Sequence, residues 1–343
     1  MNCMQILKKG RIFCLFFVLI GVSSCTKDQE IIPQQISGNA LGTTYHISYI
    51  GNEIKHIEVA IDSIIDAINH GLSTYQHNSL ISCFNSNNTS LWEDSNEYRY
   101  YESDLKHFTF MVNLSKQISV STDGAFDPSS ACLFEEYNRA KKNQIKMDDQ
   151  IIQSCLGHQG LDKIRYDSVG YPIKSDSLMQ LNFNAIAKGY LVDVLGVYFD
   201  HKKIENYLIE VGGEMIAKGE NGSGLPWTVG ITTPIPNADP TQFFHVLPLK
   251  NKAIATSGNY QNFYIIDGLV VGHTMDPRSG RPVMTNLRSA SIFHKSCAVA
   301  DAYATACMTL GLEESIALIK QDTSLSAYFI FEKEHELMGQ FVE

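Results

Sequence analysis

The stretch from Ser296 to Gly311 reads S-C-A-V-A-D-A-Y-A-T-A-C-M-T-L-G. Its alanine-rich, apolar composition predicts a helix that is too short to span a bilayer. Ser296 is suited to the N-cap of this helix, and Gly311 to the position that follows its last turn. The polar residues Asp301, Thr305 and Thr309 recur every four residues, and they therefore share one face of the helix.

Asp301 is the only acidic residue of this stretch. An ionised carboxylate on so apolar a helix is costly unless a partner compensates it. One interpretation is a buried carboxylate that is hydrogen-bonded to Thr305 or to the backbone. The other is a carboxylate and a hydroxyl that together hold a hard cation, because such cations prefer oxygen ligands. The stretch by itself leaves both interpretations open.

The composition is that of a globular protein, and 343 residues suffice for one large domain or two ordinary ones. The formal net charge is −10. Because this charge would repel a phosphate backbone, the sequence argues against a nucleic-acid-binding protein. A small phosphate-bearing ligand remains compatible with it, since a bound cation can reverse the charge locally.

Residues 1–24 predict a lipoprotein signal peptide. A positively charged segment precedes an apolar core from Ile12 to Ile20, and V-S-S stands directly before Cys25. This order resembles a bacterial lipoprotein signal, in which Cys25 becomes the lipidated N-terminus. An ordinary secretory signal with an incidental cysteine is the alternative. Residues 25–37 are polar and predict a tether, so we expect an exported protein on the periplasmic side of a membrane, anchored by lipid alone.

The cysteines that follow Cys25 are odd in number and contain no C-x-x-C pair, which excludes a thioredoxin-like motif and a zinc site of that spacing. Cys297 and Cys307 lie among alanines and are expected to be small buried hydrophobic residues. Cys83, Cys132 and Cys155 carry no comparable signal.

Helices alternate with short strands that are interrupted by glycine, which predicts an α+β fold. Isoleucines at spacings of three and four predict an amphipathic helix over residues 54–72. Alternating side chains predict a strand over residues 40–50, and Asp267-Gly268 predicts a hairpin between 263–266 and 269–271. Further helices are expected at 105–119, at 148–156 and from about residue 187 to 198.

Two other segments concentrate polar chemistry. Residues 181–193 read L-N-F-N-A-I-A-K-G-Y-L-V-D and predict a corner from a strand into a helix, where free amides can receive an anion and Lys188 adds a positive charge. Residues 272–282 read G-H-T-M-D-P-R-S-G-R-P, a loop that is rich in ionisable groups. Each signal is weak by itself.

Nine short motifs, taken together and in order, resemble the ApbE family of FAD:protein FMN transferases from about residue 38 to 331. The motifs are L-G-T-T-Y (41–45), S-T-Y-Q-H-N-S-L-I-S-C-F-N (73–85), G-A-F-D-P-S (124–129), N-A-I-A-K-G-Y-L-V-D (184–193), V-G-G-E (211–214), P-W-T-V-G-I (226–231), A-T-S-G-N-Y (255–260), H-T-M-D-P-R-S-G (273–280) and A-D-A-Y-A-T (300–305). The resemblance implies one T-fold-like catalytic domain of two packed halves, which we place at residues 38–335.

The resemblance also implies an activity. FAD would be split at its diphosphate, FMN would be attached through a phosphoester to a Thr or Ser hydroxyl of a target protein, and AMP would leave. Mg²⁺ would be required, and the target would be a flavin-carrying subunit of a membrane electron-transfer complex. The alternatives are a hydrolase that splits FAD into FMN and AMP, and a non-catalytic FAD-binding lipoprotein.

The family motifs assign roles to individual residues of this chain. By this resemblance Mg²⁺ would be held by Asp301, Thr305 and the carbonyl of Ala185. His273 would accept the proton of the target hydroxyl, Asp276 would orient His273, and Lys188 would add positive charge. The residues expected to contact FAD are Leu41, Tyr75, Gly124, Ala125, Phe126, Asn182, Lys188, Ser257, Gly258 and His273.

Four positions depart from the family pattern. Leu41 replaces the usual Met, a change of similar volume, and Leu80 replaces the usual Glu after Ser79. The other two are at Asn182 and Ala304. Asn182 stands where the family usually has Asp, and Ala304 stands where some members have a second carboxylate. Both changes remove negative charge from the expected FAD and Mg²⁺ sites.

Overall fold

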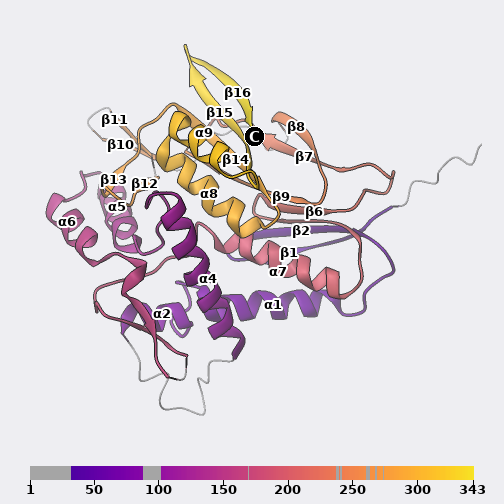
Figure 1. Cartoon of the computed structure of the whole chain (residues 1–343), viewed down its shortest axis with the longest axis horizontal. Helices are drawn as coiled ribbons and strands as arrows, with labels where there is room; N and C mark the ends of the chain where they lie inside the picture. Colours follow the sequence, from indigo (N-terminus) through magenta and orange to yellow (C-terminus); the bar gives the residue numbers. More distant parts are fainter. Residues whose placement is uncertain are drawn as a thin grey trace, which may run out of the picture.

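The computed structural model describes residues 32–87, 102–168, 170–236, 239, 242–259, 263–266, 269–272 and 274–343. Its centre is an antiparallel sheet of eight strands (Figure 1). In spatial order these strands are β1 (Gln34–Ala40), β2 (Thr43–Ile50), β5 (Asn206–Val211), β6 (Glu214–Lys218), β9 (Lys252–Gly258), β14 (Leu287–His294), β15 (Ser326–Lys333) and β16 (Glu336–Val342). The sheet therefore joins segments from both ends of the described chain.

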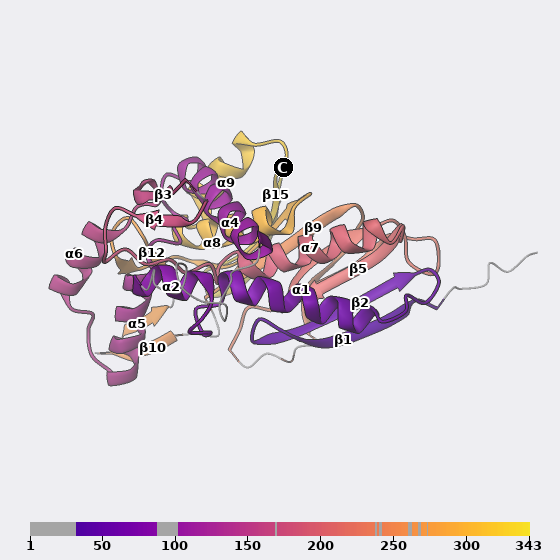
Figure 2. The same ribbon diagram turned by 90° about the horizontal axis from the view of Figure 1, so that it is seen from below.

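Four helices form the layers beside this sheet (Figures 1 and 2). Helix α7 (Ala187–His201) packs on β5 and β6, and α8 (Cys297–Leu310) packs on β9 and β14. Helix α1 (Ile57–Leu72) contacts α7, and α4 (Glu102–Ser121) contacts both α1 and α8. One large apolar core runs through the sheet and these helices, so the two halves of the fold are not separated by a linker.

Smaller elements surround this frame. They are the helices α2 (Leu80–Ser86), α5 (Ala131–Asn143), α6 (Asp149–His158) and α9 (Leu312–Gln321), the short 3-10 helix η1 (Leu161–Lys163), and four two-stranded pairs: β3 (Ile164–Tyr166) with β4 (Pro172–Lys174), β7 (Trp227–Thr232) with β8 (Phe243–Leu249), β10 (Phe263–Ile266) with β11 (Leu269–Gly272), and β12 (Met275–Asp276) with β13 (Arg281–Pro282). The predicted α+β class is confirmed.

Helix α8 begins and ends as predicted from its sequence. The Ser296 hydroxyl accepts a hydrogen bond from the amide of Val299 at 3.3 Å, and the Gly311 amide donates to the Cys307 carbonyl at 2.9 Å. The carboxylate of Asp193 on α7 caps the same helix start, because it accepts from the Ser296 hydroxyl and from the amides of Cys297 and Ala298. Negative charge at a helix N-terminus is favourable, so Asp193 ties α7 to α8.

The two helices approach most closely at Gly189. A Cβ atom at this position would lie 2.4 Å from the carbonyl oxygen of Cys297 and 2.8 Å from Cβ of Asp301. The amide of Gly189 donates a hydrogen bond of 3.0 Å to Oδ2 of Asp301. The absent side chain at Gly189 is therefore what lets α7 supply a partner to the buried carboxylate of α8.

Most of the expected elements are present, with shifted ends. The helix expected over residues 54–72 is α1, which begins at Ile57, and β10 and β11 form the expected hairpin. The expected tether and domain boundaries need correction. Strand β1 begins at Gln34, inside the expected tether, because its residues pair with β2, and β16 extends past residue 335 to Val342 because it pairs with β15. Cys25 and the expected signal peptide lie outside the described residues.

A disulfide joins Cys132 on α5 to Cys155 on α6. The sequence did not predict this pair, because nothing in the spacing of the cysteines distinguishes it. Cys297 and Cys307 are fully buried free thiols, as expected. None of the helices in the described residues is long and apolar enough to span a membrane.

We predict that Gly189→Ala destabilises the fold, because the new methyl group meets the backbone of α8. Overpacking of this kind costs about 1–3 kcal/mol of the free energy of unfolding. Gly157→Ala in α6 is the matched control, since a Cβ there has no atom within 4 Å, and helical Gly→Ala changes are favourable by about 0.5–1 kcal/mol. Urea unfolding of both variants measures the effects. Equal stability of Gly189→Ala and the unmodified protein would show that the helices can separate without cost.

Candidate active site

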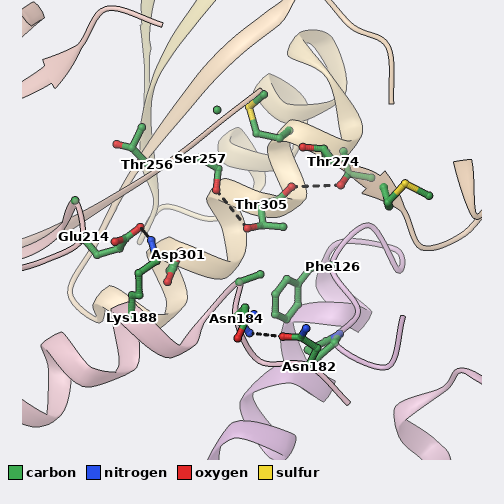
Figure 3. A pocket seen from close by; sticks show the side chains of 18 of the residues that line it. Phe126, Asn182, Asn184, Lys188, Glu214, Thr256, Ser257, Thr274, Asp301 and Thr305 are labelled. Carbon is green, nitrogen blue, oxygen red and sulfur yellow. Dashed lines mark hydrogen bonds and ion pairs between the residues drawn. The ribbon is translucent and has the colours of Figure 1, made fainter. Parts of the chain in front are cut away.

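A cavity of about 550 Å³ opens between the N-terminus of α7, the middle of α8, the end of β9 and the loop after α4 (Figure 3). This volume is in the range of small-molecule sites. The cavity brings together nine of the residues expected from the sequence. They are Ala125, Phe126, Asn182, Ala185, Lys188, Ser257, Gly258, Asp301 and Thr305. Thr309, the third polar residue on the same face of α8, also lines it.

One wall of the cavity is built from the loop at Phe126 and the segment at Asn182. The amide of Asn182 donates to the Pro128 carbonyl at 2.9 Å, which joins the two segments. Asn85 of α2 holds the neighbouring Leu181 by two hydrogen bonds, one to its carbonyl at 2.9 Å and one from its amide at 2.8 Å. Phe126 is buried and lines the cavity, and its ring is a flat apolar surface suited to an aromatic ligand.

Three charged side chains lie side by side on the opposite wall (Figure 3). Lys188 comes from the first turn of α7, Glu214 from the start of β6 and Asp301 from α8. The Lys188 ammonium contacts Oε1 of Glu214 at 2.6 Å. Only 1% of Glu214 and 3% of Asp301 is exposed to solvent. This wall therefore holds two buried carboxylates and one ammonium group.

Burial shifts the pKa values of this cluster. It raises the pKa of Glu214 to about 8, and the nearby Asp301 adds to the shift while Lys188 opposes it. Burial also raises the pKa of Asp301 to about 6, against the effects of Lys188 and the Gly189 amide. Burial acts to lower the pKa of Lys188, but the two carboxylates outweigh it and the pKa is raised. The carboxylates thus lack sufficient positive charge in their surroundings.

Hydroxyl groups line the remaining side of the charged wall. The hydroxyls of Ser257 on β9 and Thr305 on α8 lie 3.3 Å apart, and that of Thr256 lies 2.8 Å from Ser291. Thr305 is one helical turn from Asp301, so its hydroxyl and the carboxylate face the same space. A polar ligand would find hydrogen-bonding groups on this side of the cavity and an aromatic ring on the other.

The residues present fit a divalent cation. Within the described part of the chain, Oε2 of Glu214 is buried and has no hydrogen-bond partner, so this oxygen near Asp301 remains available to a ligand. Asp301, Thr305 and Ala185 line the cavity, and their carboxylate, hydroxyl and carbonyl oxygens are of the kind that would suit Mg²⁺. Across the described part of the chain no three His, Cys, Asp or Glu side chains cluster as a metal site. A cation here must therefore use hydroxyl and carbonyl oxygens in addition to carboxylates.

Some residues expected at the site lie elsewhere. Tyr75 is 82% exposed and does not line the cavity, and Gly124 does not line it either, although its neighbour Ala125 does. Leu41 occupies the turn between β1 and β2 and lines a second hollow beside α1. Oδ1 of Asp276 accepts hydrogen bonds from the backbone and side chain of Arg278. His273 lies outside the residues whose side chains the structure describes, although its neighbour Thr274 lines the cavity.

Glu214 is the main residue of this site that the sequence interpretation missed. From the sequence it was identified only as the last residue of the V-G-G-E motif. The available signal was an acidic residue directly after two glycines and before the apolar run M-I-A. Thr256, Thr274 and Asn184 also line the cavity and were not singled out.

Curated proteins that are similar to this chain are named FAD:protein FMN transferases. The FAD:protein FMN transferase of Vibrio cholerae is 29% identical over 308 residues, which cover 88% of this chain and 87% of the relative. The FAD:protein FMN transferase of Escherichia coli K12 is 30% identical over 304 residues, which cover 86% of this chain and 83% of the relative.

Solved structures agree with the fold. The flavin transferase ApbE from Vibrio cholerae superposes with a TM-score of 0.76 at 26% identity, covering 91% of this chain and 97% of that one. The flavinyl transferase ApbE of Pseudomonas stutzeri, in its apo form, gives a TM-score of 0.75 at 25% identity, covering 91% and 95%. The predicted ApbE-type fold is confirmed.

The family model of the ApbE family matches residues 41–329, most of the chain. The matched region contains the segments of α7 and α8 that meet at Gly189, and it contains every residue that lines the cavity. The chain therefore belongs to the ApbE family.

Proposed function

We propose that this protein transfers FMN from FAD to a Thr or Ser hydroxyl of a target protein and releases AMP. The observation that carries the proposal is one cavity that joins an aromatic wall at Phe126 to Lys188, Asp301 and Thr305. A flavin nucleotide has the same two parts, a flat ring system and a charged diphosphate. Membership of the ApbE family, whose curated relatives are FAD:protein FMN transferases, supports the same function.

Phosphoryl transfer depends mainly on positioning and on the stabilisation of charge. Lys188 supplies a fixed positive charge, and its place in the first turn of α7 adds the positive end of the helix dipole. Ser257 and Gly258, at the end of β9, line the cavity and would hold the diphosphate in this proposal. We propose that Asp301, Thr305 and the Ala185 carbonyl hold Mg²⁺, which when bound would neutralise the diphosphate as a Lewis acid.

The acceptor hydroxyl must lose a proton as its oxygen bonds to the phosphorus on the FMN side and the bond to AMP breaks. We assign the proton acceptor to His273. The supporting observation is that the next two residues, Thr274 and Met275, line the cavity. Asp276 is the proposed orienter of His273, and its bidentate contact with Arg278 holds that carboxylate in place.

Water would use the same groups as a protein hydroxyl, so a hydrolase differs from a transferase only in its acceptor. Mixing the protein with FAD, Mg²⁺ and a target domain, followed by mass spectrometry of the target, separates the possibilities. We expect the target to gain the mass of one FMN phosphoester. Free FMN and AMP without that gain would identify a hydrolase, and unchanged FAD would identify a binding protein.

In the same assay, Asp301→Ala should lose the Mg²⁺-dependent activity while the protein remains folded. The reason is that the change removes the carboxylate proposed to hold the cation and also relieves a buried charge. Circular dichroism checks the fold, and Mg²⁺ titration of the reaction rate checks the cation. If Asp301→Ala responded to Mg²⁺ as the unmodified protein does, Asp301 would be a structural residue only.

His273→Ala should abolish transfer while FAD still binds, because the variant lacks the proton acceptor but keeps the cavity. Removal of a general base typically lowers the rate by about 10²–10⁴-fold. Fluorescence titration with FAD measures binding, and the mass assay measures transfer. His335→Ala is the control, since that side chain is fully exposed. Normal transfer by His273→Ala would exclude the base role.

We further propose that the protein is exported, lipid-anchored through Cys25 on the periplasmic side of a membrane, and that its target is a flavin-carrying subunit of a membrane electron-transfer complex. The N-terminal sequence pattern supports export. The disulfide between Cys132 and Cys155 also supports it, because disulfides persist in oxidising compartments. A target exposed to the same compartment would be within reach of the anchored enzyme.

Cys25→Ser tests the anchor. We expect the unmodified protein to incorporate a labelled fatty acid and to sediment with membranes, whereas Cys25→Ser should do neither. An unmodified protein without label and free of membranes would show that the N-terminal segment acts only as an ordinary secretory signal, and label on Cys25→Ser would show that the lipid is carried by another residue.

A further inference from the structure

Glu214 has a free oxygen inside the cavity that the proposed mechanism does not yet use. It is the first residue of β6 and follows Gly212 and Gly213, whose φ values are 56° and 103°. This turn directs the carboxylate into the cavity beside Lys188 and Asp301 (Figure 3). Oε1 is bound by Lys188 at 2.6 Å, and Oε2 is buried without a hydrogen-bond partner among the residues that the structure describes.

The unpartnered Oε2 of Glu214 requires an explanation. A buried carboxylate oxygen without a partner is unfavourable, because it has lost its water and gained nothing in return. The charge of the surroundings increases the problem, since Lys188 is the only basic residue among the described residues that line the cavity, and it faces two carboxylates. A dication between the carboxylates would satisfy both the free oxygen and the missing positive charge.

We propose that Glu214 gives its Oε2 to the same cation as Asp301, so that the site has two carboxylates and Lys188 is their fixed counter-ion. The proposal rests on the cation of the proposed function and adds a ligand to it. The oxygen groups on this side of the cavity would then be the carboxylates of Glu214 and Asp301, the hydroxyl of Thr305 and the carbonyl of Ala185. Carboxylate, hydroxyl and carbonyl oxygens are the donor set of Mg²⁺ and Mn²⁺.

Glu210 provides a matched control from the same chain. It lies four residues earlier on β5, and its Oε2 is likewise buried without a hydrogen-bond partner, while Oε1 accepts from the Gly213 amide at 2.6 Å. Glu210 does not line the cavity. The two glutamates thus share residue type and an unpartnered oxygen but differ in access to the proposed cation.

The simplest rival role for Glu214 is to hold Lys188 in place by charge alone. Glu214→Asp separates the two roles, because it keeps the charge but shortens the side chain by one methylene. If contact with the cation matters, Glu214→Asp should lose affinity as Glu214→Gln does. If only the charge matters, Glu214→Asp should bind the cation as the unmodified protein does.

The test is titration of the full-length mature protein with Mn²⁺ alone, without FAD, with free Mn²⁺ followed by electron paramagnetic resonance. We expect Glu214→Gln and Glu214→Asp each to weaken Mn²⁺ binding by about tenfold or more, the usual size of such ligand-shell effects. Glu210→Gln should bind as the unmodified protein does. Thermal unfolding of each variant confirms that it is folded, and Glu214→Asp carries the test if Glu214→Gln does not fold.

Three results would overturn the proposal. They are unchanged Mn²⁺ affinity in Glu214→Gln, unchanged affinity in Glu214→Asp, or no Mn²⁺ binding by the unmodified protein in the absence of FAD. FMN transfer by the unmodified protein is measured separately. If the unmodified protein transfers FMN and the Glu214 variants bind Mn²⁺ with unchanged affinity, the proposed function stands and the role of Glu214 as a cation ligand is excluded.

Discussion

The site depends on a hydrogen bond between two crossing helices, from the Gly189 amide of α7 to Asp301 of α8. It forms only because Gly189 has no side chain to collide with Cys297 and Asp301. The Asp193 carboxylate reinforces the crossing by capping the start of α8. Since Lys188 is the neighbour of Gly189, the same crossing brings an ammonium group to the buried carboxylate. Fold and site therefore share one constraint, and a change that separates the helices would disturb both.

The electrostatic design follows from that crossing. Carboxylates of Asp301 and Glu214 are removed from water and share one ammonium, which leaves the wall short of positive charge. A carboxylate that is not fully paired is ordinarily excluded from an apolar protein core. Its presence is understandable where the missing charge arrives with a ligand, and a cation together with a diphosphate meets that requirement. The opposite wall, at Phe126, offers a ring surface instead of charge.

The disulfide and the hairpin at the edge of the sheet belong to the supporting frame. Cys132 to Cys155 joins α5 to α6, and α5 begins at Ala131, which lines the cavity. The disulfide therefore restrains the position of α5, whose first residue forms part of the cavity wall. Strands β15 and β16 close the sheet at its far edge, where the chain returns after α9.

Local sequence determined much of what was found. Helix α8 with its caps, the amphipathic helix α1, the hairpin of β10 and β11 and the polar face of Asp301, Thr305 and Thr309 all follow from periodicity and turn chemistry, which act between near neighbours. The sheet order, the disulfide and the role of Glu214 required the tertiary structure. Glu214, Lys188 and Asp301 come from three separate segments of the chain. Oε2 of Glu214 loses its water partners only when the folded protein buries it. No local pattern encodes such an encounter, because it is the packing of α7 and α8 on β5, β6 and β9 that brings these charges together.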